Sequence, residues 1–370
     1  MVVEYSREDR EAICDSFRRL LSDHADETRL RELVETESGF DSQLWQQMAE
    51  LGLTGIVIGD QYGGSGAGIE EVEALMEVAG DFLLAGPFVE SCVIAPSLLA
   101  ASTDETFAAP LLKSIASGES IVSVAACGKS GDWTLPPEVR ATEQADSWSL
   151  TGDAHFVSYA HVADHCIVYA NTDEGVSAFL VNMYDAGMTA TLHTSNDPTQ
   201  RLSTLRLEAV ETTLLSGVDG EARSAALRSA LVALAGEQVG GSQRIFELTM
   251  EYLKTRHQFG QPIGRFQALK HMAADLLVEL ESATSAARHA AGVMASAGDE
   301  VESLAYLAGF TCADNYRKIT ADAIQLHGGI AYTKEHSAHL YWRRAQSGQW
   351  LYSSSDRLRD LYLTELEKTL

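Results

Sequence analysis

The sequence predicts an α+β fold in which a helical region, a β region and a second helical region follow one another along 370 residues. Residues 1–118 place apolar side chains at three- and four-residue spacing, as in RRLLSDHADETRLRELVE. Residues 119–220 contain short runs rich in Val, Ile, Thr and aromatic residues, separated by turn residues. Residues 221–370 have no proline after Pro262 and return to helical periodicity.

Each region is expected to form one domain. In the N-terminal helical domain, Pro87, Pro96 and Pro110 separate the helices, with a short helix expected around residues 88–94. The turns TGD, NTDEG and SNDPT divide the β domain into strands of an antiparallel barrel or sandwich. The last region is expected to be a helix bundle, with one stripe made by Phe266, Leu269, Met272, Leu276, Leu277 and Leu280.

Composition excludes several classes of protein. The formal net charge of -26 argues against non-specific nucleic-acid binding, which needs a basic surface. No apolar run is long enough to span a membrane, and the charged N-terminus is unlike a signal peptide. The five cysteines form no CxxC pair, and no metal-ligand spacing is evident, so a cytoplasmic protein without a metal is expected.

A cationic turn, TRHQFGQPIGRFQ at residues 255–267, stands out in this acidic chain. The planar guanidinium of Arg256 can donate two parallel hydrogen bonds to a phosphate, and Gly260 and Gly264 permit tight turns. A helix expected to begin near Arg265 would add free N–H groups for an anion. A diphosphate ligand and a plain helix–helix turn are both compatible with this pattern.

A second glycine-bearing stretch is AIQLHGGIAYTKEH, residues 323–336. Gly328 and Gly329 follow a helix expected to begin near Val301. Paired glycines at this position are typical of a helix cap, and they also leave room for a ligand to approach the backbone.

Together these stretches resemble the acyl-CoA dehydrogenase family. The block R-x-x-F-G-x-x-[IL]-x-x-[FH]-Q matches here at Arg256, Phe259, Gly260, Ile263, Phe266 and Gln267, and the block Q-x-x-G-G matches at Gln325, Gly328 and Gly329. The loop YGGSG, the segment SLTGDAHFVSYAHVADHCIVYA and the tail LYWRRA resemble further family blocks in the same order. The resemblance covers nearly the whole chain.

The resemblance implies a helical domain, a β domain, a C-terminal four-helix bundle, and an FAD shared across a subunit boundary. It implies that Arg256, Phe259 and Gln267 hold the pyrophosphate or adenosine end, and that Gln325, Gly328 and Gly329 line the same cofactor. Phe156, Val157 and Ser158 occupy the positions that the family places beside the isoalloxazine ring, with Ser158 near N5.

The family reaction needs a carboxylate to remove the α proton of an acyl-CoA, and the aligned positions lack one. An ungapped alignment on residues 343–345 places Tyr352 at the usual glutamate position, and Ala230 falls at the alternative position on the first bundle helix. Tyr352 is a poor base at neutral pH. Glu237 and Asp356 are the nearest carboxylates in sequence and stay weak candidates.

Four functions remain open from the sequence. The favoured one is a subunit of an α2β2 tetramer, similar to the glutamate-lacking chains of actinobacterial enzymes of steroid side-chain degradation. In that case an unlike chain supplies the base, and an electron-transfer flavoprotein or similar protein accepts the electrons. The others are a homotetrameric dehydrogenase with Glu237 or Asp356 as base, a scaffold without catalysis, and a flavin monooxygenase.

Overall fold

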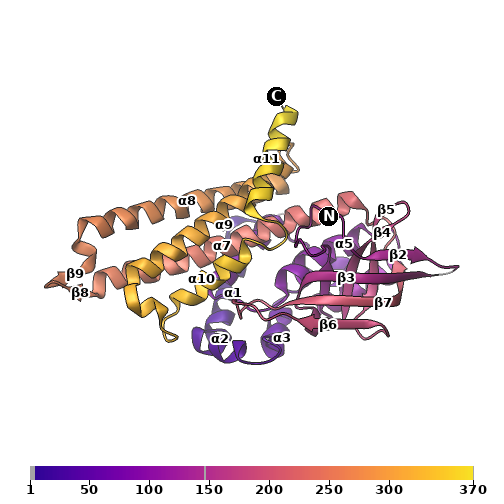
Figure 1. Cartoon of the computed structure of the whole chain (residues 1–370), viewed down its shortest axis with the longest axis horizontal. Coiled ribbons are helices and arrows are strands. Elements are labelled where there is room, and N and C mark those ends of the chain that lie inside the picture. The colour runs from indigo at the N-terminus through magenta and orange to yellow at the C-terminus, as the bar shows by residue number, and fades with distance from the viewer. Residues whose placement is uncertain (1–4, 146, 370) are drawn as a thin grey trace.

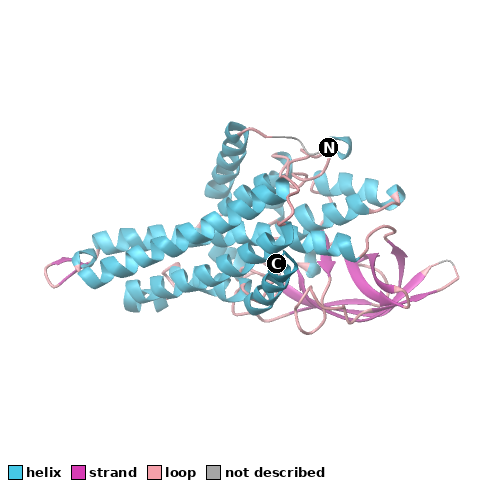
Figure 2. Cartoon of the chain, turned by 90° about the horizontal axis from the view of Figure 1, so that it is seen from above, coloured by secondary structure: helices cyan, strands magenta, loops and turns pink. Residues whose placement is uncertain are grey.

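The computed structural model describes residues 5–145 and 147–369 and has three parts in sequence order. Helices come first, a β-barrel follows at one end of the molecule, and a bundle of long helices extends away from it (Figures 1 and 2). This arrangement confirms the predicted α+β fold. The change from helix to strand falls between Ala116 and Val122, and the return to helix between Leu214 and Gly220.

The N-terminal part consists of six α-helices and two short helical turns. Its first helix starts at a capping box, in which Ser6 and Asp9 each bond to the other's backbone N–H. Residues 90–94, inside the expected short helix, form a π-helical turn that continues into α5. The elements are α1 (Arg7–His24), α2 (Glu27–Val34), α3 (Ser42–Glu50), η1 (Asp60–Tyr62), α4 (Ile69–Asp81), η2 (Glu90–Ile94), α5 (Ala95–Ala101) and α6 (Glu105–Ala116).

The central part is a seven-stranded sheet that closes into a barrel. The closed path runs β4–β2–β3–β7–β5 and back to β4, while β1 pairs with β4 and β6 pairs with β7. Alternate apolar side chains fill the interior, among them Leu150, Val168 and Phe179. The strands are β1 (Val122–Ala125), β2 (Arg140–Glu143), β3 (Trp148–Ser158), β4 (His165–Thr172), β5 (Gly175–Asn182), β6 (Met188–Leu192) and β7 (Leu202–Leu214), with η3 (Ala160–Val162) between β3 and β4.

The C-terminal part is a bundle built on three long helices, α7, α8 and α9. α7 packs along α4 and α9, and α9 packs along α8, α10 and α11. A small hairpin joins α7 to α8 at the end of the molecule farthest from the barrel (Figure 1). The elements are α7 (Gly220–Thr255), β8 (His257–Gln258), β9 (Gln261–Pro262), η4 (Ile263–Arg265), α8 (Gln267–Ala295), α9 (Val301–His327), η5 (Gly328–Tyr332), α10 (Ala338–Gly348) and α11 (Ser355–Thr369).

Candidate functional site

The cationic turn forms the hairpin between α7 and α8. Phe259 and Gly260 both have positive φ, 54° and 77°, and make the two-residue turn between β8 and β9. The Arg256 carbonyl accepts a hydrogen bond from the Ile263 N–H at 2.8 Å, which closes the hairpin at its base. Phe259 is 90% exposed, and Gln267 begins α8 with its amide 3.0 Å from His271 Nε2. The three residues are therefore on the surface at one tip of the molecule.

The second glycine-bearing stretch lies next to this hairpin. α9 ends at His327, whose ring packs on Tyr252 of α7 with the centroids 4.6 Å apart. Gln325 is in the last turn of α9, and Gly328 follows it with a φ of 66°. The structure thus brings together the two stretches that the sequence predicted to bind one ligand.

Glycines in these turns leave their surroundings open. A Cβ added at Gly260, Gly328 or Gly329 would meet no heavy atom within 4 Å, other than those of its chain neighbours. The backbone therefore has free space beside it, as a bound dinucleotide requires. The Arg256 guanidinium makes no ion pair within residues 5–145 and 147–369, so it is free to bind an anion. These residues fit a diphosphate.

Phe156, Val157 and Ser158 lie at the end of β3. A break in the register between Ala154 and Val157 bends the strand there, and Phe156 has a φ of 54°. Val157 points into the barrel core and is buried, whereas Phe156 is 41% exposed. Phe156 and Ser158 line a cavity of about 330 Å³ between the barrel and the segment that follows α10. A cavity of this size and apolar character suits a ring-shaped ligand.

The two groups of predicted FAD residues are far apart in the chain's fold. β3 belongs to the barrel, whereas β8, β9 and the end of α9 lie at the opposite end of the bundle (Figure 1). The residues predicted for the flavin ring are therefore at the cavity beside the barrel, and those predicted for the diphosphate are at the tip of the bundle.

The 330 Å³ cavity contains a residue that the sequence analysis missed. Glu90 is the only carboxylate among the described lining residues, which are Glu90, Val124, Cys127, Ser130, Gly131, Trp133, Phe156, Ser158, Leu202, Ser347, Trp350, Leu351 and Tyr352. Burial raises the pKa of Glu90, and hydrogen bonds from Tyr352 and Ser158 oppose the shift. The sequence could have indicated this residue, because Glu90 is the only charged residue between Asp81 and Asp104 and so is an isolated charge in an apolar segment.

The two positions that normally hold the catalytic glutamate are both buried. Tyr352 lines the cavity, and its hydroxyl donates to Glu90 Oε1 at 2.9 Å. Burial, together with the charge of Glu90, raises the pKa of Tyr352 well above its usual value, so the phenol stays protonated. Ala230 is fully buried in α7. Neither side chain can accept an α proton near neutral pH.

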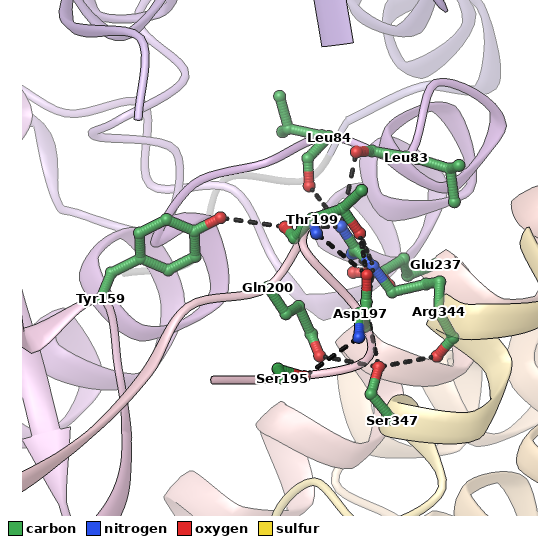
Figure 3. A network of polar contacts seen from close by, with 10 residues as sticks. All are labelled: Leu83, Leu84, Tyr159, Ser195, Asp197, Thr199, Gln200, Glu237, Arg344 and Ser347. Carbon is green, nitrogen blue, oxygen red and sulfur yellow. Dashed lines mark hydrogen bonds and ion pairs between the residues drawn. The ribbon is translucent and has the colours of Figure 1, made fainter. Parts of the chain in front are cut away.

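Glu237 is held in a buried ion-pair network. Its Oε1 lies 2.8 Å from Arg344 Nη1, and Arg344 Nε lies 3.3 Å from Asp197 (Figure 3). Burial lowers the pKa of Arg344, but the charges of Glu237 and Asp197 outweigh this and raise it. Arg344 Nε also donates to the Thr199 hydroxyl, and Nη2 donates to the carbonyls of Thr199, Leu83 and Leu84. A carboxylate fixed in this way is a structural partner rather than a base.

Asp356 also has an arginine partner, on the surface of the molecule. It lies in the first turn of α11, its side chain is 96% exposed, and it pairs with Arg359 at 3.0 Å. It does not line the cavity beside Ser158. Neither Glu237 nor Asp356 lines the cavity beside Ser158, and both carboxylates are paired with arginines.

A second surface pocket, of about 360 Å³, lies between α1, α7 and α10. Its arginines, Arg18 and Arg244, both pair with Asp81, and none of the predicted site residues lines it. Within the described residues, no group of three or more His, Cys, Asp or Glu side chains is arranged to hold a metal ion. The 330 Å³ cavity beside Ser158, called the cleft below, is therefore the better candidate site.

Helices, barrel and bundle around this cleft define an oxidoreductase of the acyl-CoA dehydrogenase type. Family models agree: residues 7–119 match the acyl-CoA dehydrogenase N-terminal domain and residues 222–363 match the C-terminal domain. The chain belongs to the acyl-CoA dehydrogenase family, as its sequence motifs predicted.

Related proteins match along almost the whole chain. Acyl-CoA dehydrogenase IpdE2 of Mycobacterium tuberculosis is 32% identical over 356 residues, which cover 96% of each chain. The ChsE4–ChsE5 complex of Mycobacterium tuberculosis includes a chain with a TM-score of 0.91, 25% identity and 99% coverage of both chains. The Tcur3481–Tcur3483 steroid acyl-CoA dehydrogenase variant has a TM-score of 0.88 and 25% identity, and covers 97% of this chain and 99% of the other.

Family membership confirms the expected reaction class and cofactor. Acyl-CoA dehydrogenases are flavoenzymes that oxidise the CH–CH bond next to an acyl-CoA thioester, with FAD as cofactor. In the part of the chain that the structure describes, no helix combines the length and the apolar character needed to cross a bilayer.

Proposed function

We propose that this chain is the FAD-binding subunit of an acyl-CoA dehydrogenase in which an unlike chain of the same family supplies the catalytic glutamate. The observation that carries the proposal is the separation of the FAD residues. The residues predicted for the flavin ring line the cavity where the barrel meets the helical parts, whereas those predicted for the diphosphate lie at or beside the hairpin at the end of the bundle farthest from the barrel (Figure 1). A complete site therefore needs a second chain.

The proposed roles of the cofactor residues are those that the family motifs imply. Arg256 binds the FAD pyrophosphate, with Phe259 and Gln267 beside the adenosine end. Gln325, Gly328 and Gly329 line the same part of the cofactor. Phe156 and Ser158 would line the place of the isoalloxazine ring, with the Ser158 hydroxyl available to hydrogen-bond near N5, and the buried Val157 would fix the strand between them. When bound, FAD supplies the hydride acceptor of the reaction.

Two further observations support an unlike partner. The cleft of this chain has no carboxylate at either family position, because Tyr352 and Ala230 stand there. Apolar side chains are exposed near the diphosphate residues and on the bundle, among them Phe259, Tyr332 and Val278. Exposed apolar patches of this kind are typical of protein interfaces.

We infer a bulky acyl-CoA, such as a steroid side-chain thioester, as the substrate of the assembled enzyme. Support comes from the solved relatives, since one is named as a steroid acyl-CoA dehydrogenase and another as a complex of two differently named chains. An electron-transfer flavoprotein or a similar acceptor would reoxidise the flavin. All five cysteines are free, which favours the reducing environment of the cytoplasm.

Co-expression with candidate partner chains tests this function. The chain is produced alone and together with an acyl-CoA dehydrogenase chain encoded next to it. Assembly is measured by light scattering, FAD content by absorbance, and activity by anaerobic bleaching of the flavin with acyl-CoA. We expect full FAD occupancy and bleaching only in the mixed assembly. Bleaching by the lone chain would contradict the need for a partner's base.

The other functions have separate signatures in the same assay. An assembly that never contains flavin would indicate a scaffold. Oxygen consumption with a hydroxylated product would indicate a monooxygenase.

A further inference from the structure

Tyr352 and Glu90 meet across the cleft of this chain. The Tyr352 hydroxyl donates to Glu90 Oε1 at 2.9 Å, and both side chains are buried. Each residue lines two spaces, the 330 Å³ cavity beside Ser158 and a smaller one beside Arg344. The hydrogen-bonded pair is therefore part of the wall between these spaces, together with Ser158 and Leu351.

Three contacts hold Tyr352 in this place. The backbone N–H of Trp133 donates to the Tyr352 carbonyl at 2.7 Å, and the rings of the two residues pack edge to face with their centroids 5.0 Å apart. The third contact is the hydrogen bond to Glu90. The backbone of Tyr352 has a φ of 66°, a conformation that large residues keep only when their surroundings enforce it. The ring is consequently fixed rather than free to swing aside.

Little room remains on the bundle side of the pair. The smaller space has a volume of about 30 Å³, enough for one or two water molecules. Arg344 and Glu237 form part of its wall, and their ion pair is anchored to Thr199 and to the Leu84 carbonyl (Figure 3). Ligand pockets for drug-sized molecules are about ten times larger or more. An acyl chain cannot enter this space without displacing buried groups.

We propose that Tyr352 and Glu90 form a latch that closes this chain's cleft to acyl groups, so that the cleft accepts a planar flavin ring but no acyl thioester. The latch consists of the Tyr352 ring, its hydrogen bond to Glu90 and its packing on Trp133. This inference rests on the proposed function, because it assigns acyl-CoA binding to the cleft of the partner chain.

The test counts acyl-CoA sites by calorimetric titration of the FAD-loaded mixed assembly. The probe is 2,2-dimethylbutyryl-CoA, which has no α proton and so cannot be dehydrogenated. We expect the Tyr352→Ala assembly to bind one more probe molecule per pair of unlike chains than the wild type. Tyr352→Phe keeps the ring and should add no site. Tyr341→Ala, which removes a buried tyrosine outside the cleft, is the matched control and should also add none.

Several outcomes overturn the latch. They are a wild-type assembly with one probe molecule bound per chain, a folded and FAD-loaded Tyr352→Ala assembly without the extra site, and an extra site in Tyr352→Phe. Assembly and FAD content are measured first, so a failure to assemble contradicts the proposed function and not the latch. In that case the lone chain is titrated, and the latch predicts no site for the wild type and one for Tyr352→Ala.

Discussion

At the scale of single residues, the buried charges of this chain are arranged for structure. Arg344 is 2% exposed and has two carboxylate partners, and all three of its guanidinium nitrogens bond to side chains or carbonyls around it. Such a network tolerates the loss of one partner poorly, because the remaining charge stays buried and uncompensated. Glu237 is thus explained by Arg344 and needs no catalytic role.

Replacing Glu237 distinguishes a structural role, as the partner of Arg344, from a catalytic role as the base. Glu237→Gln should lower the free energy of unfolding by about 3–5 kcal/mol, because it leaves the positive charge of Arg344 under-compensated. Denaturant unfolding measures the loss. Asp356→Asn is the control, and its exposed ion pair should contribute less than about 1 kcal/mol. A Glu237→Gln protein of normal stability that no longer supports flavin bleaching would instead identify Glu237 as the base.

Glu73 provides a residue-scale prediction about pH. Burial, reinforced by the charge of Glu77, raises the pKa of Glu73 from 4.5 to about 9, and its Oε1 has no hydrogen-bond partner. A carboxyl with a raised pKa in the folded state favours folding fully below pH 4.5, and this contribution is lost as the pH rises toward 9. Glu73→Gln should therefore gain thermal stability over the wild type as the pH increases from 5 to 8. The exposed Glu35→Gln should show no such trend.

At the scale of elements, α7 connects every part of the molecule. Its 36 residues extend from the barrel to the far hairpin, and it packs closely along α4 through Gly236 and Gly240. Side chains are buried on most of its circumference, so α7 shows no single apolar stripe. By contrast, the predicted stripe on α8 was partly right, since Leu276 and Leu280 are buried while Leu277 is 44% exposed.

The close approach of α4 and α7 can be tested at Gly240. A Cβ at this position would overlap the backbone of Glu77, so Gly240→Ala should push the helices apart and destabilise the protein by about 1–3 kcal/mol or more. Gly292→Ala on α8 is the control, because its Cβ would meet only the Glu70 carboxylate at 3.8 Å. That change should be neutral or should stabilise by up to about 1 kcal/mol, since alanine is the better helix former. Equal effects of the two substitutions would refute the packing argument.

Sequence motifs and periodicity predicted the order of helical and β regions, because the spacing of apolar residues along the chain indicates which face of each element is buried. The Arg256 and Gly328 segments were predicted to share one ligand, and they do lie side by side. The sequence could not reveal that Arg344 captures Glu237, or that Tyr352 reaches Glu90, because those pairs are separated by more than 100 residues. Contacts of this range depend on how the domains pack, and no spacing along the chain encodes them.

At the scale of the whole molecule, the proposed function gives each chain two halves of different FAD sites. It predicts that assembly controls cofactor binding, because the full free energy of FAD binding would be gained only when two chains meet. The formal net charge of -26 fits this arrangement, because in so acidic a chain a cationic side chain such as Arg256 at the bundle tip is a specific place for an anion to bind.

Arg256 is the residue through which this dependence can be measured. Under the proposed function, Arg256→Gln would remove a charge-assisted bond to the pyrophosphate, which is worth about 1.5–3 kcal/mol, so FAD should dissociate about 10- to 100-fold more readily from the mixed assembly. Flavin fluorescence on dilution measures the change. Arg140→Gln is the control, because Arg140 pairs with Asp173 on the surface of the barrel and its replacement should leave FAD affinity unchanged.

Wild-type FAD affinity should also fall when the assembly is diluted into separate chains. An affinity that is independent of protein concentration, and unaffected by Arg256→Gln, would mean that one chain holds the whole cofactor by itself.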